Sequence, residues 1–371
     1  MSHRIAAQQP RRSRQGAHSA TVYPGRVSIG RGVLRYAAAG LAAGAGWWAW
    51  RHQHSPTVAT WAPGRGENRR AGPLQVRVLG SGEPVVVLLH GMLAAGDSFG
   101  AAYDALAEGA TLVVPDLLGF GGSMDTPGPT DAPAHVAALE TALTALGLAN
   151  RPTVVAGHSM GGTLALHWAA QHLDRVRSVV TFGAPLYRNR VEADEHVAAM
   201  GWMEALLSGD GAIPRATCAW MCRHRTAASW LAVASRPDLP VPVARSGVNH
   251  TWATYSGALD GLIRDTGWST ALDVLSHAGI PVTLVEGDAD PVPVHGRAAE
   301  LSRIRPFTRY LIRPGADHGI PLIDPGWCRR VIADAVTSSS TSLSAGAATA
   351  AGRPTDELRN DLGLSTMMHS K

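Results

Sequence analysis

Lysine is almost missing from this chain of 371 residues: Lys371 is the single one, and arginine supplies the other basic side chains. The charge is unevenly spread. Residues 1–70 hold eleven arginines and one acid, Glu67, a balance of +10, while the rest holds 22 basic and 28 acidic residues, a balance of −6. An acidic body disfavours nucleic acid as a partner. A basic arm favours a membrane surface.

Cysteine is also scarce. The chain has three cysteines: Cys218, Cys222 and Cys328. Three is a small and odd number, so they cannot form a complete disulfide framework. Cys218 and Cys222 are four residues apart and would share one face of a helix, with His224 nearby. Small apolar packing residues, a local disulfide and a metal site are the three interpretations. We favour packing and expect no metal ion.

Long hydrophobic runs are lacking, and a mean hydropathy near zero argues against a polytopic membrane protein. Residues 33–50 are the exception: no charge occurs from Tyr36 to Trp50, and three tryptophans close the segment. It is short for a span of about 20 residues, but tryptophans are typical of the membrane interface. A membrane anchor, an export signal and an Ala-rich helix on the body stay open. We expect membrane association or export, with a cytoplasmic location as the alternative.

Strand and helix patterns alternate through the middle of the chain. Apolar runs predict buried strands at 85–89, 111–114, 153–156, 178–182, 282–285 and 309–312, and helical periodicity predicts helices near 98–108, 133–147, 160–172, 295–303 and 326–336. Such alternation is typical of an α/β fold with a mostly parallel, doubly wound sheet.

The same patterns divide the chain. We expect the folded body to begin near Gly72. The predicted segments are a disordered basic arm (1–32), the apolar segment (33–50), a linker (51–70), the first part of the core (71–184), a helical cap (185–276), the second part of the core (277–337) and a disordered, Ser- and Ala-rich tail (338–371).

One motif carries chemistry directly. The strand at 153–156 runs into Gly157-His158-Ser159-Met160-Gly161, and a helical pattern follows. A serine between strand and helix needs glycine two residues away on each side, because the turn leaves no room for larger side chains. The helix start also directs N–H groups at developing negative charge. Strand, G-x-S-x-G and helix together predict that Ser159 is a nucleophile.

From about Gly72 to Val336 the chain resembles the α/β-hydrolase family, with a serine nucleophile and a helical cap. Besides the Ser159 motif, the resemblance is carried by His90-Gly91-Met92 after an apolar strand, by Asp116 in the run Pro115–Ser123, and by the loops around Asp290 and His318. It implies an oxyanion hole formed by the backbone N–H groups of Met92 and Met160. It gives Asp116 a structural role.

The triad order in this family is Ser, acid, His. The loop Gly287-Asp288-Ala289-Asp290-Pro291-Val292-Pro293 matches the family spacing at Asp290, with Asp288 as the competitor. His318, after the last strand, is the expected base, and its neighbour Asp317 is expected to be a loop residue. His158 is expected to pack beside the nucleophile.

The expected reaction is hydrolysis of a small carboxylic ester with an apolar acyl or alkyl group, through an acyl-enzyme and without a cofactor. Trp220, Trp230, Trp252 and Tyr255 make the cap rich in apolar side chains, which suits such a substrate or simply packs the cap. A carbon–carbon bond hydrolase, a thioesterase and a non-catalytic binding protein on the same scaffold are the alternatives. The oligomeric state is not indicated.

Overall fold

The computed structural model describes residues 31–200 and 212–351. It divides into a unit ending at Trp47 and a body beginning at Trp48; helix α1 (Arg31–Gln53) runs from one into the other. Among the described helices, none has both the length and the apolar character needed to cross a membrane. The arm expected to be disordered lies outside the described residues, except for its last two positions.

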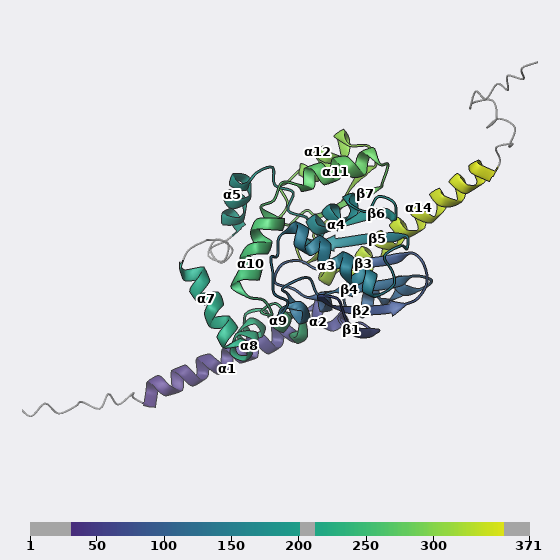
Figure 1. Cartoon of the computed structure of the whole chain (residues 1–371). Helices are drawn as coiled ribbons and strands as arrows, with labels where there is room; N and C mark the ends of the chain where they lie inside the picture. Colours follow the sequence, from purple (N-terminus) through teal and green to yellow (C-terminus); the bar gives the residue numbers. More distant parts are fainter. Residues whose placement is uncertain (1–30, 201–211, 352–371) are drawn as a thin grey trace, which may run out of the picture. The chain divides into compact units, whose positions relative to one another are not determined.

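An eight-stranded sheet forms the centre of the body (Figure 1). Its order is β1-β2-β4-β3-β5-β6-β7-β8. The first two strands pair antiparallel with their neighbours, and the other pairs are parallel. The strands are β1 (Glu67–Ala71), β2 (Leu74–Gly80), β3 (Val85–Leu89), β4 (Thr111–Pro115), β5 (Thr153–His158), β6 (Val176–Phe182), β7 (Val282–Gly287) and β8 (Thr308–Arg313). The predicted α/β fold with a mostly parallel sheet is confirmed.

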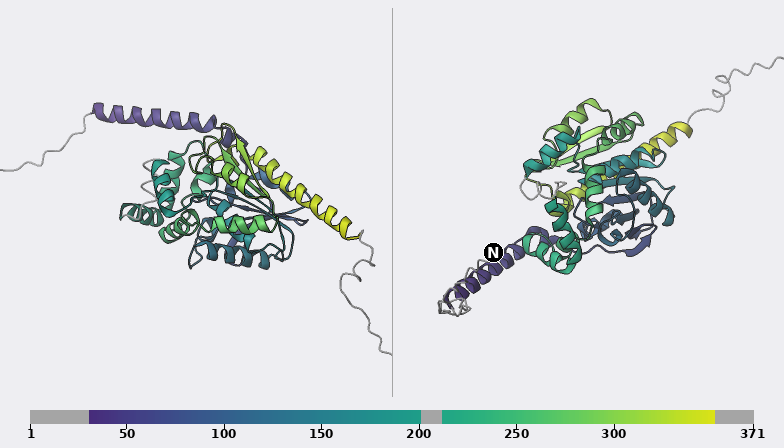
Figure 2. Two further views of the ribbon diagram at one scale, coloured as in Figure 1. Left: turned by 90° about the horizontal axis from the view of Figure 1, so that it is seen from above. Right: turned by 60° about the vertical axis from the view of Figure 1, so that its left-hand side comes forward.

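Two apolar layers enclose the sheet. Strand β3 divides its side chains between them: Val85, Val87 and Leu89 face one layer, and Val86 and Leu88 face the other. Figure 2 (left) shows helices on both sides of the sheet. The helical segments of the core are α2 (Pro56–Thr60), η1 (Gly96–Ser98), η2 (Ala101–Ala107), η3 (Gly121–Ser123), α3 (Ala132–Ala145), α4 (Met160–Ala170), α12 (Arg297–Ile304), α13 (Ile320–Ile323) and α14 (Pro325–Ala351).

The described part of the interval between β6 and β7 is mainly helical, and we refer to it as the cap. Its described segments are α5 (Arg190–Met200), α7 (Ala212–Arg223), α8 (Arg225–Ser235), α9 (Val241–Ser246), α10 (Trp252–Ala258), the π-helical turn η4 (Leu259–Ile263) and α11 (Trp268–His277). Cys218 and Cys222 lie on α7 as free thiols, and Cys222 Sγ donates to the carbonyl of His250.

The structure differs from the sequence-based boundaries at both ends of the body. The segment expected to be a linker contains α2, whose N-cap is Ser55, and most of β1. The body therefore includes residues before Gly72. At the other end, α14 continues to Ala351, whereas a disordered tail was expected from Ser338; residues 352–371 lie outside the described ranges. Neither segment shows apolar periodicity, because β1 is polar and the end of α14 consists mostly of small residues. The sequence pattern therefore could not predict them.

Candidate active site

Ser159 lies at the sharp turn between β5 and α4. Its backbone has φ 53° and ψ −122°, a conformation that costs a non-glycine residue about 1–3 kcal/mol. The turn is closely packed: a Cβ at Gly157 would overlap the carbonyl of Gly161, and a Cβ at Gly161 would overlap the carbonyl of Leu89. The G-x-S-x-G spacing is thus a steric requirement of this turn, which raises Ser159 above the carboxyl ends of the strands.

His318 and Asp290 form a hydrogen-bonded pair. Nδ1 of His318 lies 3.0 Å from both carboxylate oxygens of Asp290. The Asp290 side chain is fully buried, and its Oδ1 also accepts the N–H of Val292 at 2.9 Å. When Nδ1 donates to this carboxylate, the neutral imidazole carries a lone pair on Nε2, as a general base requires.

Asp288, the competing acid, makes a different contact. Its Oδ1 accepts the N–H of Gly315 at 2.6 Å, so it ties two loops together. The neighbouring acid Asp317 accepts the N–H of Gly319 at 2.8 Å. The structure therefore pairs His318 with Asp290, at the position selected by the loop spacing.

The end of β6 brings Ser159 and the His318–Asp290 pair to one place. The N–H of Ser159 donates to the carbonyl of Phe182 at 2.8 Å. The next residue, Gly183, has φ 58°, and a Cβ there would lie 2.7 Å from Asp290 Oδ2 and 3.0 Å from His318 Nδ1. Among the described residues, no hydrogen bond joins Ser159 Oγ to His318. Sequence reasoning missed Gly183, although a glycine directly after a buried strand on this edge was a usable signal.

His158 packs against the candidate base. The two imidazole rings lie 4.7 Å apart, and His158 Nε2 is 2.7 Å from the carbonyl oxygen of His318. Burial, with the nearby His318, lowers the pKa of His158 to about 3. It is therefore neutral, and its Nε2–H can donate to that carbonyl and hold the His318 loop.

The two backbone N–H groups expected to form the oxyanion hole belong to Met92 and Met160. Met92 follows β3, and Met160 is the first residue of α4. Within the described ranges neither N–H has a hydrogen-bond partner. The β3 end is close to Ser159, since a Cβ at Gly91 would lie 3.1 Å from Ser159 Cβ.

His90 holds the loop that carries Met92. It is fully buried; Nδ1–H donates to the carbonyl of Gly91 at 2.8 Å, and Nε2 accepts the N–H of Leu117 at 2.9 Å. Burial lowers its pKa, so the neutral Nδ1–H form matches both bonds.

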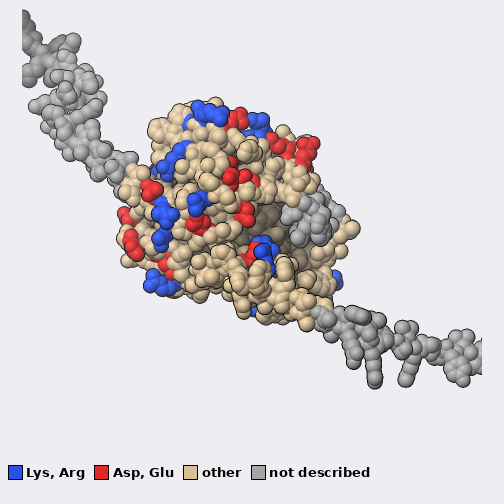
Figure 3. Space-filling view, turned by 180° about the vertical axis from the view of Figure 1, so that it is seen from behind, with Lys and Arg blue, Asp and Glu red and all other residues tan. Residues whose placement is uncertain are grey.

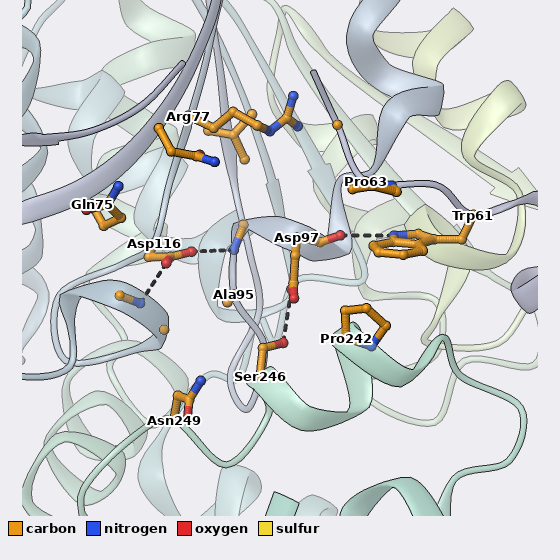
Figure 4. Close-up of a pocket in the computed structure, with 16 residues that line it drawn as sticks. Trp61, Pro63, Gln75, Arg77, Ala95, Asp97, Asp116, Pro242, Ser246 and Asn249 are labelled. Atoms are coloured by element: carbon orange, nitrogen blue, oxygen red, sulfur yellow. Dashed lines mark hydrogen bonds between the residues drawn. The ribbon is translucent and has the colours of Figure 1, made fainter. Parts of the chain in front are cut away.

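Asp116 also makes structural contacts. Its two carboxylate oxygens each accept a backbone N–H at 2.7 Å, from Gly96 and from Gly122 (Figure 4). It thereby joins the loop after β3 to the loop after β4.

A cavity of about 600 Å³ lies beside this loop, on the side of β1, β2 and α9 (Figure 4). Ser159, Asp290 and His318 do not line it. At its wall, Ser246 of α9 donates to Asp97 Oδ1 at 3.0 Å, and the Trp61 indole donates to the Asp97 carbonyl at 3.1 Å. Burial, partly offset by the Ser246 bond, raises the pKa of Asp97 to about 7. The cavity therefore lies where the core meets the cap, and it is not part of the Ser159 site.

Comparison with known proteins agrees with the fold. Residues 84–210 match the family model of the α/β hydrolase fold. The chain is 36% identical over 141 residues to a pimeloyl-[acyl-carrier protein] methyl ester esterase of Chromobacterium violaceum, covering 38% of this chain and 52% of that protein. It is 40% identical over 101 residues to lipase 3 of a Moraxella species, covering 27% and 31%.

The chain thus spans about half, or less, of the length of these two curated relatives. Among solved structures, E-2-(acetamidomethylene)succinate hydrolase superposes with a TM-score of 0.57 at 21% identity, over 74% of this chain and all of that one. This last likeness concerns the fold.

Proposed function

We propose that this chain, which belongs to the α/β-hydrolase fold family, is a serine hydrolase that cleaves carboxylic esters with an apolar acyl or alkyl group. The observation that carries the proposal is the hydrogen-bonded Asp290–His318 pair. Its carboxylate is buried, and it packs against the Gly183 turn, whose neighbour Phe182 accepts the N–H of Ser159. The esterase and the lipase among the relatives support an ester substrate.

The proposed reaction begins with proton transfer. Nε2 of His318 takes the hydroxyl proton of Ser159 while Oγ attacks the ester carbonyl, and Asp290 stabilises the imidazolium that forms. The N–H groups of Met92 and Met160 donate to the oxyanion. Removing one such donor typically costs about 10²–10³ in rate.

The second half repeats these roles. The imidazolium gives its proton to the departing alcohol, which leaves an acyl group on Ser159 Oγ. A water molecule, deprotonated by His318, then attacks the acyl carbonyl and releases the acid.

A fluorophosphonate probe tests the nucleophile. We expect the wild-type protein to be labelled and Ser159→Ala to remain unlabelled, because the probe phosphonylates an activated serine. Equal labelling of both proteins would refute the role of Ser159 and place the reactive group elsewhere. No labelling of either protein would favour a non-catalytic binding protein.

A chain-length series of p-nitrophenyl esters tests the substrate class. We expect kcat/KM to rise with acyl length over the short members of the series, since each methylene buried on binding contributes about 0.8 kcal/mol. Labelling of Ser159 together with negligible turnover of every ester would count against an ester substrate and favour a thioester or a carbon–carbon bond.

A further inference from the structure

Two cap helices expose apolar side chains to solvent. On α7, Ile213 and Trp220 are 67% and 41% exposed; on α8, Trp230 and Leu231 are 53% and 60% exposed. Surface helices normally turn their polar face outward. We call these four side chains, with the exposed Ala216 and Ala227 between them, the outer cap face.

The charges around the outer cap face are mainly positive. Residues 212–246 contain five arginines and one acid, Asp238. That acid pairs with Arg236 at 2.7 Å. From Thr226 to Ser235, α8 carries no charge at all. In the view from behind, the lower right of the body is almost wholly tan, whereas the left side carries many red and blue side chains (Figure 3).

An arginine also sits directly over one of the exposed tryptophans. The guanidinium of Arg245, on α9, lies 5.0 Å from the centre of the Trp230 ring. Such a pair suits the headgroup region of a bilayer, where the indole meets the acyl boundary and the guanidinium meets phosphate.

We propose that the outer cap face docks on the surface of an anionic lipid bilayer. Exposed Trp, Leu and Ile would enter the interface, and the surrounding arginines would lie against acidic headgroups. A second copy of the chain fits less well, since a two-fold contact would bring the same five arginines toward each other. The proposal does not depend on the proposed hydrolase activity.

The test needs a readout at the cap itself, because the arginine-rich first 70 residues could hold the full chain on vesicles. Leu231→Cys and Ile304→Cys in the full chain, each labelled with an environment-sensitive fluorophore, supply it. Ile304 is the matched control: it is 63% exposed and lies on α12, far from α8 in Figure 1. Wild-type protein treated with the same label corrects for Cys222.

Vesicles of phosphatidylcholine with phosphatidylserine should shift the emission at position 231 to the blue and leave position 304 unchanged. Trp230→Ser should weaken the binding measured at position 231 about tenfold, as loss of a buried aromatic side chain predicts. Turnover of a short soluble ester by the same variants reports separately on folding and on the proposed activity.

Three results would overturn the proposal. The first is equal responses at positions 231 and 304. The second is an equal response to vesicles of phosphatidylcholine alone. The third is a blue shift at position 231 that depends on protein concentration without vesicles, which would assign the face to a second copy of the chain.

Discussion

The carboxyl edge of the sheet and the outer part of the cap follow opposite packing rules. At the sheet edge, Gly157, Gly161 and Gly183 stand where any Cβ would meet a carbonyl or a carboxylate. In the cap, Trp230 and Leu231 face solvent. The turn at the edge therefore tolerates displacements of only a few tenths of an ångström, and this close packing leaves a recognisable glycine motif in the sequence. The exposed surface of the cap depends on composition, which many sequences can supply.

The sharpest test of the edge compares two neighbouring acids. Asp290→Asn should lower kcat for a soluble ester roughly 10²–10⁴-fold, because the amide cannot stabilise the imidazolium or select its tautomer. Asp288→Asn should leave kcat within about threefold, because its partner is the N–H of Gly315. Steady-state kinetics of both variants measures the two changes in kcat. A larger loss in Asp288→Asn would assign the triad acid to Asp288 and contradict the role proposed for Asp290.

A second test separates close contact from backbone strain. Gly183→Ala should lower kcat about 10–100-fold, because the new methyl group displaces Asp290 and His318. Gly147→Ala is the matched control: its φ of 71° is as unfavourable, but a Cβ there meets nothing within 4 Å. Both variants should lose about 1–2 kcal/mol of unfolding free energy. If Gly147→Ala loses activity equally, strain rather than contact explains the effect.

The smallest effect is expected where the two regions meet, at Asp97 and Ser246. The folded-state pKa of Asp97 is about 7 and its ordinary value is 3.8, so the folded protein binds the extra proton between these values. Stability should therefore fall as the pH rises from about 4 to 7, by an amount on the order of 1–2 kcal/mol for this half-buried carboxyl. Urea unfolding midpoints at pH 5 and pH 8 measure this loss.

Asp97→Asn should reduce that loss without removing it, because burial also raises the pKa of Glu286 to about 7. The asparagine still accepts the Ser246 hydrogen bond, so the core–cap contact is kept. If the unfolding midpoint of Asp97→Asn changes with pH as much as that of the wild type, Asp97 does not titrate in this range.

Much of the core could be predicted from the sequence because burial leaves a periodic signal. Val85–Leu89 forms a strand with the predicted bounds, and the chain reverses at Ser159 as its flanking glycines require. Strand β1 could not be predicted in this way. Its sequence, ENRRA, is exposed at four of five positions, and it is held by backbone pairing to β2.

The cap was less predictable. Its tryptophans were expected to suit an apolar substrate or to pack the cap, yet Trp220 and Trp230 are 41% and 53% exposed. Helical periodicity locates a helix and its apolar face, but it does not say whether that face meets the core, a ligand or solvent. Two further apolar residues of this interval, Trp202 and Met203, lie outside the described residues.

The contacts at the start of the body have a consequence for the order of synthesis. The Trp48 indole donates to the carbonyl of Val233 at 3.0 Å, and Ser55 Oγ donates to the carbonyl of Asp238 at 2.7 Å, across 185 and 183 positions of sequence. Residues 48–55 therefore leave the ribosome well before these partners are translated. Because contacts across such a sequence distance form slowly, this segment reaches its final place late in folding.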